Sequence, residues 1–266
     1  MRIDQLLVQR GLASTRSQAQ RLIAAGVQWH SGSGWRRVVK NGDEVATDAA
    51  VELLDSAEAR FVSRGGLKLE GALQRLAFSV AGARCLDVGQ STGGFTDCLL
   101  QHGAASVIGI DVGFAQLHDQ LRRDPRVTCV ERVNARYLSA ENLRTVLPEQ
   151  ALPGNEASPV PWFDVVVGDL SFISQTLVLP AVVPWLKAGG ALLMLVKPQF
   201  ELQPGQVGKG GIVTDDRLLA VVERRIRAAH AALRMKVQAY VPSVIDGGDG
   251  NREFFVHSIR QPEPLP

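Results

Sequence analysis

The 266-residue sequence is poor in cysteine, and Cys85, Cys98 and Cys129 stand at spacings that match no metal-binding pattern. Its five histidines are scattered, with no two at the spacing of metal ligands, so we expect no structural metal. An odd number of thiols in apolar surroundings argues against a disulfide framework. These features favour reduced core cysteines in a cytoplasmic protein.

Long apolar runs are also missing, since none approaches the roughly 20 residues that a membrane helix needs. The first eleven residues carry charges inside a short apolar stretch and lack a cleavage-site pattern. We therefore interpret them as mature structure and not as a signal peptide. Taken together, these absences lead us to expect no membrane partner.

The net charge is only +2, but it is unevenly distributed. Residues 1–40 contain seven basic residues and a single acidic one, whereas residues 41–60 are mainly acidic. A basic patch at one end of a nearly neutral chain is typical of a module that binds a polyanion. A solvated helix face explains the charge equally well, so the charge leaves both interpretations open.

The first 60 residues predict a small domain of two short helices and a small sheet. One helix is expected over Ser14–Gly26, where Thr15 and Gln18 suit a capping box and Gly26 suits the end of the helix. Arg16 and Arg21 lie off the apolar face of that helix, available to phosphates. Alternating residues around the Asn41-Gly42 turn predict a β-hairpin over Val38–Leu54.

From Gly66 onward, short apolar strands alternate with helical stretches, which predicts a mainly parallel sheet covered on both faces. The last two strands have too short a connection for a helical crossover, so they should pair antiparallel at the sheet edge. This pattern indicates an α/β fold, a Rossmann-like class I methyltransferase sheet of seven strands with the last antiparallel. The expected strands are Arg84–Val88, Val107–Asp111, Val127–Glu131, Phe163–Gly168, Ala191–Val196, Val237–Val241 and Phe254–Ile259, and the expected helices are Gly94–His102, Ala115–Arg122, Ser174–Leu186 and Asp215–Leu233. The proline-rich segment 148–161 predicts an exposed loop.

A glycine-rich loop, Asp87–Phe95, follows the first of these strands and opens a helix. It matches neither the dinucleotide fingerprint nor a phosphate-binding loop with its terminal Gly-Lys-Ser/Thr. A carboxylate at the strand end disfavours a pyrophosphate and suits a cofactor with a cationic amino group, such as S-adenosylmethionine. The predicted cofactor residues in this segment are Asp87, Gly89, Ser91, Gly93, Gly94 and Phe95.

Two further polar residues follow the next strands. Asp111 ends the second strand, where an acidic residue can accept both ribose hydroxyls of an adenosine. Asn134 follows the third strand and could meet the adenine ring. A turn or helix cap is the alternative for each, and for Asn134 it is as good as the cofactor role.

Lysine is scarce, with six lysines against 23 arginines, so a lysine in a site is of interest because it can lose a proton. Lys197 and Asp169 end predicted strands, Lys68 precedes the first strand, and Glu253 begins the last. Ligands of open α/β sheets bind at the carboxyl ends of the strands. Since the final strand is antiparallel, its start should lie at the same edge.

Such a cluster suits methylation of a ribose 2′-hydroxyl, a poor nucleophile that must lose its proton during attack. A lysine can serve as the base where a like charge and partial burial favour its neutral form. We assign this role to Lys197, with Asp169 orienting it, Lys68 supplying the like charge, and Glu253 fixing Lys68 or the ribose. Two ordinary ion pairs at the sheet rim are the alternative.

In these motifs the chain resembles the TlyA-type family of ribosomal RNA 2′-O-methyltransferases, also labelled haemolysin A-like. Met1–Gly26 is similar to an S4 RNA-binding domain, and several later segments match the family in order: Ser63–Lys68, Leu86–Leu99, Asp169–Ser174, Lys197–Glu201 and Gly250–Phe255. The resemblance implies a small α+β S4-like domain over residues 1–60 and an FtsJ-like methyltransferase domain over residues 61–266. It also implies a Lys-Asp-Lys-Glu tetrad at Lys68, Asp169, Lys197 and Glu253, and 2′-O-methylation of cytidine in ribosomal RNA or ribosomal subunits.

The resemblance has two departures. Gln90 replaces the small residue usual in the glycine loop, where a larger side chain can crowd the cofactor. The segment Trp29–Trp35 replaces the usual turn of the S4 hairpin, and a packed tryptophan is favoured there over one that stacks on a base. The predicted RNA contacts are Arg2, Arg16, Arg21 and Lys209, the last in a family-like loop, Gly205–Gly211, interpreted as a lid or RNA contact.

Two other function classes compete with this hypothesis. A non-catalytic RNA-binding or ribosome-assembly factor would bind RNA without transferring a methyl group, but the intact tetrad and glycine loop argue against it. A cytolysin, as the haemolysin label suggests, would lyse liposomes. Neither a membrane helix nor a secretion signal supports that class.

Overall fold

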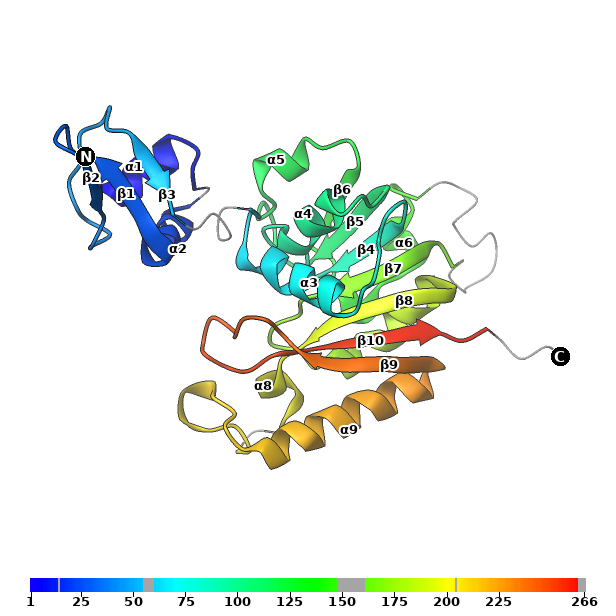
Figure 1. Ribbon diagram of the computed structural model, residues 1–266. Helices are drawn as coiled ribbons and strands as arrows, with labels where there is room; N and C mark the ends of the chain where they lie inside the picture. Colours follow the sequence, from blue (N-terminus) through cyan, green and yellow to red (C-terminus); the bar gives the residue numbers. More distant parts are fainter. Residues whose placement is uncertain (14, 55–59, 148–160, 204, 263–266) are drawn as a thin grey trace. The chain divides into compact units, whose positions relative to one another are not determined.

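The computed structural model describes residues 1–13, 15–54, 60–147, 161–203 and 205–262 (Figure 1). The chain forms two compact units, Met1–Leu67 and Lys68–Pro266. The domain bounds predicted from the sequence, 1–60 and 61–266, stay a prediction, because compactness shows where contacts separate and not where a function begins. Most of the predicted loop, residues 148–160, lies outside the described part of the chain.

The first unit packs two helices, α1 (Ile3–Gln9) and α2 (Arg16–Gly26), with a three-stranded antiparallel sheet. Thr15 caps α2 as expected, because its side chain accepts the amide hydrogen of Gln18 at 3.1 Å. Apolar faces of both helices and strand residues form a core of their own, with Ile3, Leu7 and Leu22 fully buried. The predicted small α+β domain is therefore present.

The expected hairpin over Val38–Leu54 is wrong. The central strand β1 (Val27–His30) pairs on one side with β2 (Trp35–Arg37) and on the other with β3 (Val51–Leu53). Asn41-Gly42 does form a turn, but the chain beyond it pairs with the N-terminus, through an isolated bridge between Arg2 and Glu44. The turn follows from local sequence, whereas the pairing of β1 with β2 and β3 depends on segments outside the turn.

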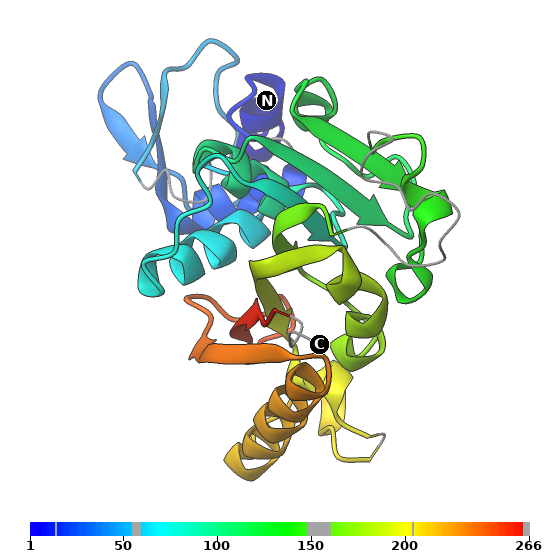
Figure 2. The same ribbon diagram turned by 90° about the vertical axis from the view of Figure 1, so that its right-hand side faces the viewer.

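The second unit contains a seven-stranded sheet in the order β6-β5-β4-β7-β8-β10-β9, with helices on both faces (Figure 2). Strands β4, β5, β6, β7 and β8 run parallel, and β10 is antiparallel to both β8 and β9. The predicted α/β sheet and its antiparallel last strand are confirmed. The strands are β4 (Arg84–Val88), β5 (Ser106–Asp111), β6 (Val127–Glu131), β7 (Phe163–Gly168), β8 (Leu186–Val196), β9 (Met235–Pro242) and β10 (Phe254–Arg260).

The long helix α9 and the helix after the glycine loop, α4, match the predictions closely. The stretch expected to be one helix over Ser174–Leu186 is instead a 3-10 turn, a short α7 and a second 3-10 turn, because Pro180 and Pro184 interrupt it. The helix expected over Ala115–Arg122 is reduced to its last turn. The helices of this unit are α3 (Arg64–Arg75), which begins before the unit boundary, α4 (Gly94–Gln101), α5 (Asp119–Arg122), α6 (Ala140–Leu143), α7 (Leu179–Val182), α8 (Pro198–Glu201) and α9 (Asp216–Ala232).

The central strands of the sheet are buried on both faces. The cross-strand row Leu86, Val166 and Leu192 has no exposed surface, and neither has the next row, Asp87, Val167 and Leu193, which points to the opposite face. This is the near-continuous apolar pattern of a parallel sheet between two helical layers. No helix in the described part of the chain is long and apolar enough to span a membrane.

Candidate active site

Polar side chains gather where β4, β5, β7 and β8 end. These four strands are neighbours and parallel, so their carboxyl ends meet at one edge of the sheet. Val88, Asp111, Gly168 and Val196 are the last residues of the strands. Open α/β folds bind ligands at the carboxyl ends of the strands, at the point where the strand order reverses.

The glycine loop turns away from β4 with its backbone close to the neighbouring loop. Gly89 has φ +83°, and a Cβ at this position would lie 2.7 Å from the carbonyl oxygen of Asp169. Ser91 also takes a positive φ, +48°, and its amide donates to Asp111 at 2.7 Å. A residue without a Cβ is therefore required at Gly89, since any side chain would push the two loops apart.

A cavity of about 340 Å³ lies beside this loop. Its polar lining includes Ser91, Asp111, Asn134 and Asp169 together with the backbone of Gly89, and its apolar walls include Ile110, Val112, Val133, Leu170, Ile173 and Val178. A mostly apolar slot with a carboxylate at one strand end suits an adenosine whose ribose hydroxyls donate to that carboxylate. The cavity therefore fits the predicted cofactor.

Asp111 and Asn134, for which a turn or cap is the alternative to a cofactor role, make local turn or cap hydrogen bonds and also line the cavity. Asp111 accepts amide hydrogens from Ser91 and Gly113, and Asn134 accepts the amide hydrogen of Arg136 as the cap of a 3-10 turn. Both also line the cavity. Because an ionised carboxylate has further lone pairs, Asp111 can still accept from a ribose. Their cofactor roles stay predictions.

The remaining predicted cofactor residues, Asp87, Gly93, Gly94 and Phe95, are buried and do not line the cavity. Phe95 stacks on Phe255 with ring centroids 6.0 Å apart. Asp87 has no exposed surface and accepts the hydroxyl hydrogen of Thr96 at 2.7 Å. Burial raises the pKa of Asp87 to about 7, and the bond from Thr96 opposes that shift.

The expected crowding of the cofactor by Gln90 is not observed. Gln90 is 3% exposed and is absent from the cavity lining. Its amide points into the protein and donates to Thr96 at 2.9 Å. There is room for the side chain because the adjacent residue of β5 is Gly109.

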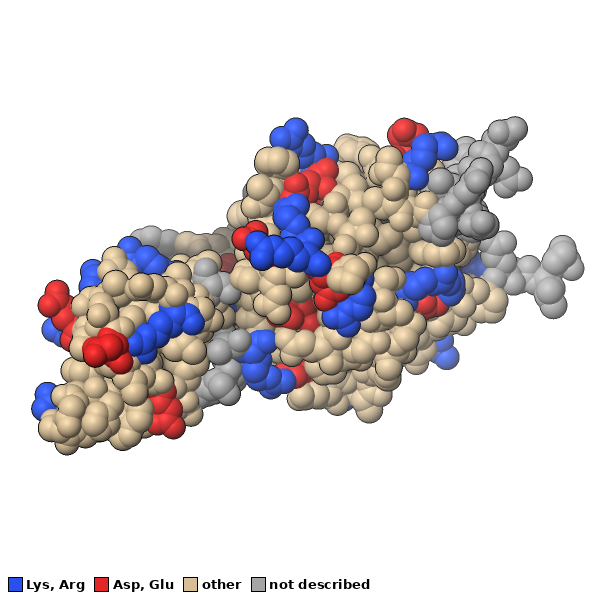
Figure 3. Space-filling view, turned by 90° about the horizontal axis from the view of Figure 1, so that it is seen from above, with Lys and Arg blue, Asp and Glu red and all other residues tan. Residues whose placement is uncertain are grey.

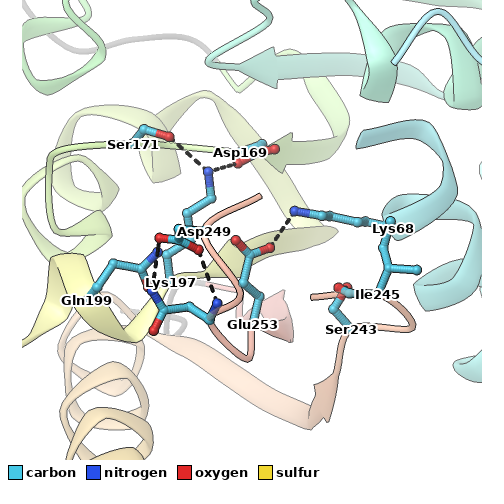
Figure 4. Close-up of polar contacts among 10 residues, drawn as sticks. Lys68, Asp169, Ser171, Lys197, Gln199, Ser243, Ile245, Asp249 and Glu253 are labelled. Carbon is cyan, nitrogen blue, oxygen red and sulfur yellow. Dashed lines mark hydrogen bonds and ion pairs between the residues drawn. The ribbon is translucent and has the colours of Figure 1, made fainter. Parts of the chain in front are cut away.

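The four predicted catalytic residues form two ion pairs at the same edge (Figure 4). Lys197 Nζ lies 2.5 Å from Asp169 Oδ1, and it donates to the hydroxyl of Ser171 at 2.9 Å. Lys68 Nζ, from α3, donates to Glu253 Oε2 at 2.6 Å. The tertiary structure thus brings together groups that are up to 185 positions apart in the sequence.

Glu253 connects the two pairs electrostatically. Burial raises the pKa of the Glu253 carboxyl, while Lys68 and Lys197 both oppose that shift and Asp169 adds to it. The side chains of Lys68 and Glu253 are only 9% and 3% exposed, whereas those of Lys197 and Asp169 are 12% and 24% exposed. The Lys197 pair is therefore the one more open to a bound ligand.

A second cavity, of about 560 Å³, adjoins the Lys197 pair. Its lining includes Lys197 and Glu253, and it shares Ser171 and Phe172 with the first cavity. Phe172 is 91% exposed, has φ +64°, and lies with its ring centroid 5.1 Å from that of Phe200. The sequence gives no signal for Phe172, because neither its exposure nor its left-handed backbone can be deduced from the local pattern.

The predicted RNA-binding residues are distributed over both units. Arg2 and Arg16 bind the same buried carboxylate, Asp4, at 2.9 and 3.0 Å, and both arginine side chains stay about half exposed. Arg21 is on the same helix as Arg16, and Lys209 is in a 3-10 turn of the other unit. In the view of Figure 3, basic and acidic side chains are interspersed, so this face shows no continuous basic patch.

Comparison with known proteins identifies the families. The FtsJ-like methyltransferase profile matches residues 61–260, and the S4 domain profile matches residues 1–26. A Mycobacterium tuberculosis protein named 16S/23S rRNA (cytidine-2′-O)-methyltransferase TlyA is 43% identical, and the alignment covers 96% of this chain and 88% of that protein. Hemolysin A of Brachyspira hyodysenteriae is 35% identical over 97% of this chain and 100% of that protein. A solved structure from Streptococcus thermophilus, described provisionally as a hemolysin, is 37% identical with a TM-score of 0.71 and covers 99% of this chain and 90% of that one.

The sheet, the glycine loop and the cavity at the strand ends define a Rossmann-like enzyme that transfers methyl groups from S-adenosylmethionine. More particularly, the chain belongs to the FtsJ-like methyltransferases of the TlyA type, which also carry an S4 domain.

Replacing Asp87 with asparagine tests the burial of this carboxyl. A raised pKa in the folded state means that Asp87 opposes folding progressively as pH rises from about 4, its unfolded pKa, to about 7. We expect Asp87→Asn to raise the melting temperature little at pH 4.5 and most above pH 7. Above pH 7 the free energy of unfolding should increase by an amount on the order of 4 kcal/mol. Calorimetry without cofactor measures this, with the exposed Asp48→Asn as control, and an equal effect at both pH values would contradict it.

Proposed function

We propose that this enzyme methylates a ribose 2′-hydroxyl of ribosomal RNA, with cytidine as the target nucleotide. The observation that carries the proposal is the Lys197–Asp169 pair, which lies where two adjoining cavities share Ser171 and Phe172. The first cavity suits the cofactor, and the second is open enough for a nucleotide. The groups that would accept the proton of the hydroxyl, Lys197 and Asp169, are therefore next to both cavities.

S-adenosylmethionine supplies an electrophilic methyl group on a sulfonium when it is bound. Asp111 would accept hydrogen bonds from the ribose of its adenosine, and the backbone at Gly89 and Ser91 would line the other side. Apolar residues such as Ile110 and Val133 would exclude water from this part of the site. These roles follow from the shape and chemistry of the first cavity.

Lys197 takes the proton of the 2′-hydroxyl in this proposal. Asp169 and Ser171 hold its amine from one side, which directs the nitrogen toward the wall shared by the two cavities. A hydroxyl oxygen becomes a strong nucleophile only as its proton leaves, so a positioned amine lowers the barrier. After the transfer the ammonium stays paired with Asp169.

Lys68 and Glu253 act as the supporting pair. Both are buried, and their 2.6 Å bond holds Glu253 between the two lysines in Figure 4. The positive Lys68 compensates the buried carboxylate of Glu253, which would otherwise be an unpaired charge beside Lys197. Glu253 also lines the second cavity, where its carboxylate can accept a hydrogen bond from a substrate ribose.

Recognition of RNA is assigned to the S4 unit and to Phe172. Asp4 fixes Arg2 and Arg16 at the surface, and their remaining guanidinium hydrogens can bind phosphates. Phe172 presents an exposed ring beside the second cavity, as a surface on which a base can stack. The cytidine and the ribosomal RNA come from the name of the Mycobacterium tuberculosis relative.

Lys197→Ala should lower the rate of methyl transfer by at least about 100-fold, because it removes the proposed base. The assay uses undermethylated ribosomal subunits and labelled cofactor, with 2′-O-methyls mapped by nucleotide. Affinity for S-adenosylmethionine should stay within about twofold of the wild-type value, because Lys197 does not line the first cavity.

Lys187→Ala is the matched control for this experiment. Lys187 is near the beginning of β8, the strand that Lys197 directly follows, and it pairs with Asp164 at the opposite end of the strand from the site. We expect this variant to retain wild-type activity. Full activity of Lys197→Ala would exclude Lys197 as the base, and methyl groups found only on bases would exclude ribose as the target.

Replacing both Arg16 and Arg21 with alanine should weaken RNA binding and reduce the slope of log affinity against log salt by about 2, while cofactor affinity stays the same. Fluorescence anisotropy with a ribosomal RNA fragment at several salt concentrations measures both quantities. The control removes two arginines of α9, Arg217 and Arg227, which pair with neighbouring acids. Equal losses in the two double variants would argue against a role of the S4 unit.

A further inference from the structure

Four buried residues form a cluster beneath the glycine loop. Asp87 of β4 and Gly109 of β5 are cross-strand partners, so they are side by side on the sheet. Thr96 is in the first turn of α4, and Gln90 is in the loop between. Asp87 and Thr96 have no exposed surface, and Gln90 is 3% exposed. The cluster therefore joins the end of β4, the glycine loop and the first turn of α4.

The hydrogen bonds of this cluster run in one direction. Thr96 gives its single hydroxyl hydrogen to Asp87 Oδ2 at 2.7 Å, so its oxygen must accept at the other contact. Gln90 Nε2 supplies that hydrogen at 2.9 Å. The chain of bonds thus starts at an amide, passes through a hydroxyl and ends at a carboxylate. While Asp87 is ionised, only a donor at position 90 completes it.

The fit between Gln90 and Gly109 is steric. A Cβ at Gly109 would lie 2.0 Å from the Gln90 amide carbon and 2.1 Å from its nitrogen. No real Cβ approaches a neighbour so closely, so the side chain of Gln90 fills the space that the glycine leaves. A smaller residue at position 90 would leave a void there, and a larger residue at position 109 would expel the amide.

We propose that Gln90 is a positioning residue for cofactor binding, which holds the glycine loop in its binding conformation before RNA is present. Its amide ties the middle of the loop to the first turn of α4, and Thr96 ties that turn to the end of β4. Gly89 and Ser91, on either side of Gln90, line the first cavity. Since a preformed loop does not have to be ordered by the ligand, the affinity for S-adenosylmethionine is higher.

The expected effect falls on cofactor affinity and not on the chemical step. Gln90 lines neither cavity, and its side-chain amide donates to Thr96, which is not one of the proposed catalytic residues. The inference rests on S-adenosylmethionine as the cofactor and is independent of which RNA nucleotide is methylated. Binding of the cofactor to the RNA-free protein therefore tests it separately from the proposed function.

Gln90→Ala should raise the dissociation constant for S-adenosylmethionine by about three- to tenfold, the effect of one lost buried hydrogen bond. Calorimetric titration of the RNA-free, full-length protein measures it. With subunits as substrate, KM for the cofactor should rise by a similar factor while kcat stays within about twofold. Gln101→Ala is the control, because Gln101 is on α4, as Thr96 is, but its amide donates to Asp97. Unchanged cofactor affinity in Gln90→Ala would overturn the proposal.

Gln90→Glu separates the donor from the volume. The two side chains have the same shape, but an ionised glutamate cannot donate to Thr96, the residue that also bonds to the Asp87 carboxylate. Cofactor affinity relative to the wild type should be lowest at pH 8, where both carboxyl groups are ionised, and should recover toward pH 5.5, because protonation of the glutamate and of Asp87 restores a donor to Thr96. A ratio that is constant with pH would mean that only volume matters at this position and would overturn the positioning role of the amide.

Gly109→Ala tests the steric fit in a double-mutant cycle. Alone, the added methyl group collides with the amide and should weaken cofactor binding at least as much as Gln90→Ala. In the Gln90→Ala background the space is free, so the same substitution should have little further effect on cofactor affinity or melting temperature. Strictly additive effects would show that the two positions are independent and would contradict the proposed packing.

Discussion

The parallel pairing of β5, β4, β7 and β8 is the constraint on which the site depends. Parallel strands end at the same edge, so every loop that leaves this edge starts within a few ångströms of its neighbours. Asp111 is the last residue of β5, and Asp169 and Lys197 directly follow β7 and β8. Glu253 joins them because β10 is antiparallel to β8 and therefore starts where β8 ends. A single antiparallel strand thus completes a group of residues that a wholly parallel sheet would have separated.

The charges at this edge are tolerated because they are paired. A lone buried ammonium or carboxylate would be strongly destabilising, whereas Lys68 with Glu253 and Lys197 with Asp169 compensate each other. Burial is unequal between the pairs, and the more exposed pair is the one at the wall shared by both cavities. The enclosed pair supplies a fixed electrostatic environment, and the open pair is accessible to a ligand. This division of roles underlies the proposed chemistry.

Beneath the glycine loop, a titratable carboxyl group, Asp87, is buried together with two neutral polar side chains, Thr96 and Gln90. Asp87 was expected to face the cationic part of the cofactor, yet it is enclosed under the loop and bonded to Thr96. Gln90 was expected to crowd the cofactor, and instead it fills the space above Gly109. Both differences have one physical origin: the side chains of Asp87 and Gln90 are buried in the interior, where Thr96 and Gly109 accommodate them. Which side each one takes depends on residues of β5 and α4.

The sequence by itself determined the order of strands and helices, the antiparallel end of the sheet, the glycine loop and the residue types of the tetrad. Those features depend on local periodicity, on glycine and proline, and on connection lengths, all of which are written along the chain. Only the tertiary structure decided which strand pairs with β1, where the prolines break the helix over Ser174–Leu186, that Phe172 is exposed between two cavities, and that Gln90 points inward. These depend on contacts between distant segments, such as the 185 positions that separate Lys68 from Glu253. No local pattern encodes such contacts, because their free energy comes from shape and charge that form only when the chain is folded.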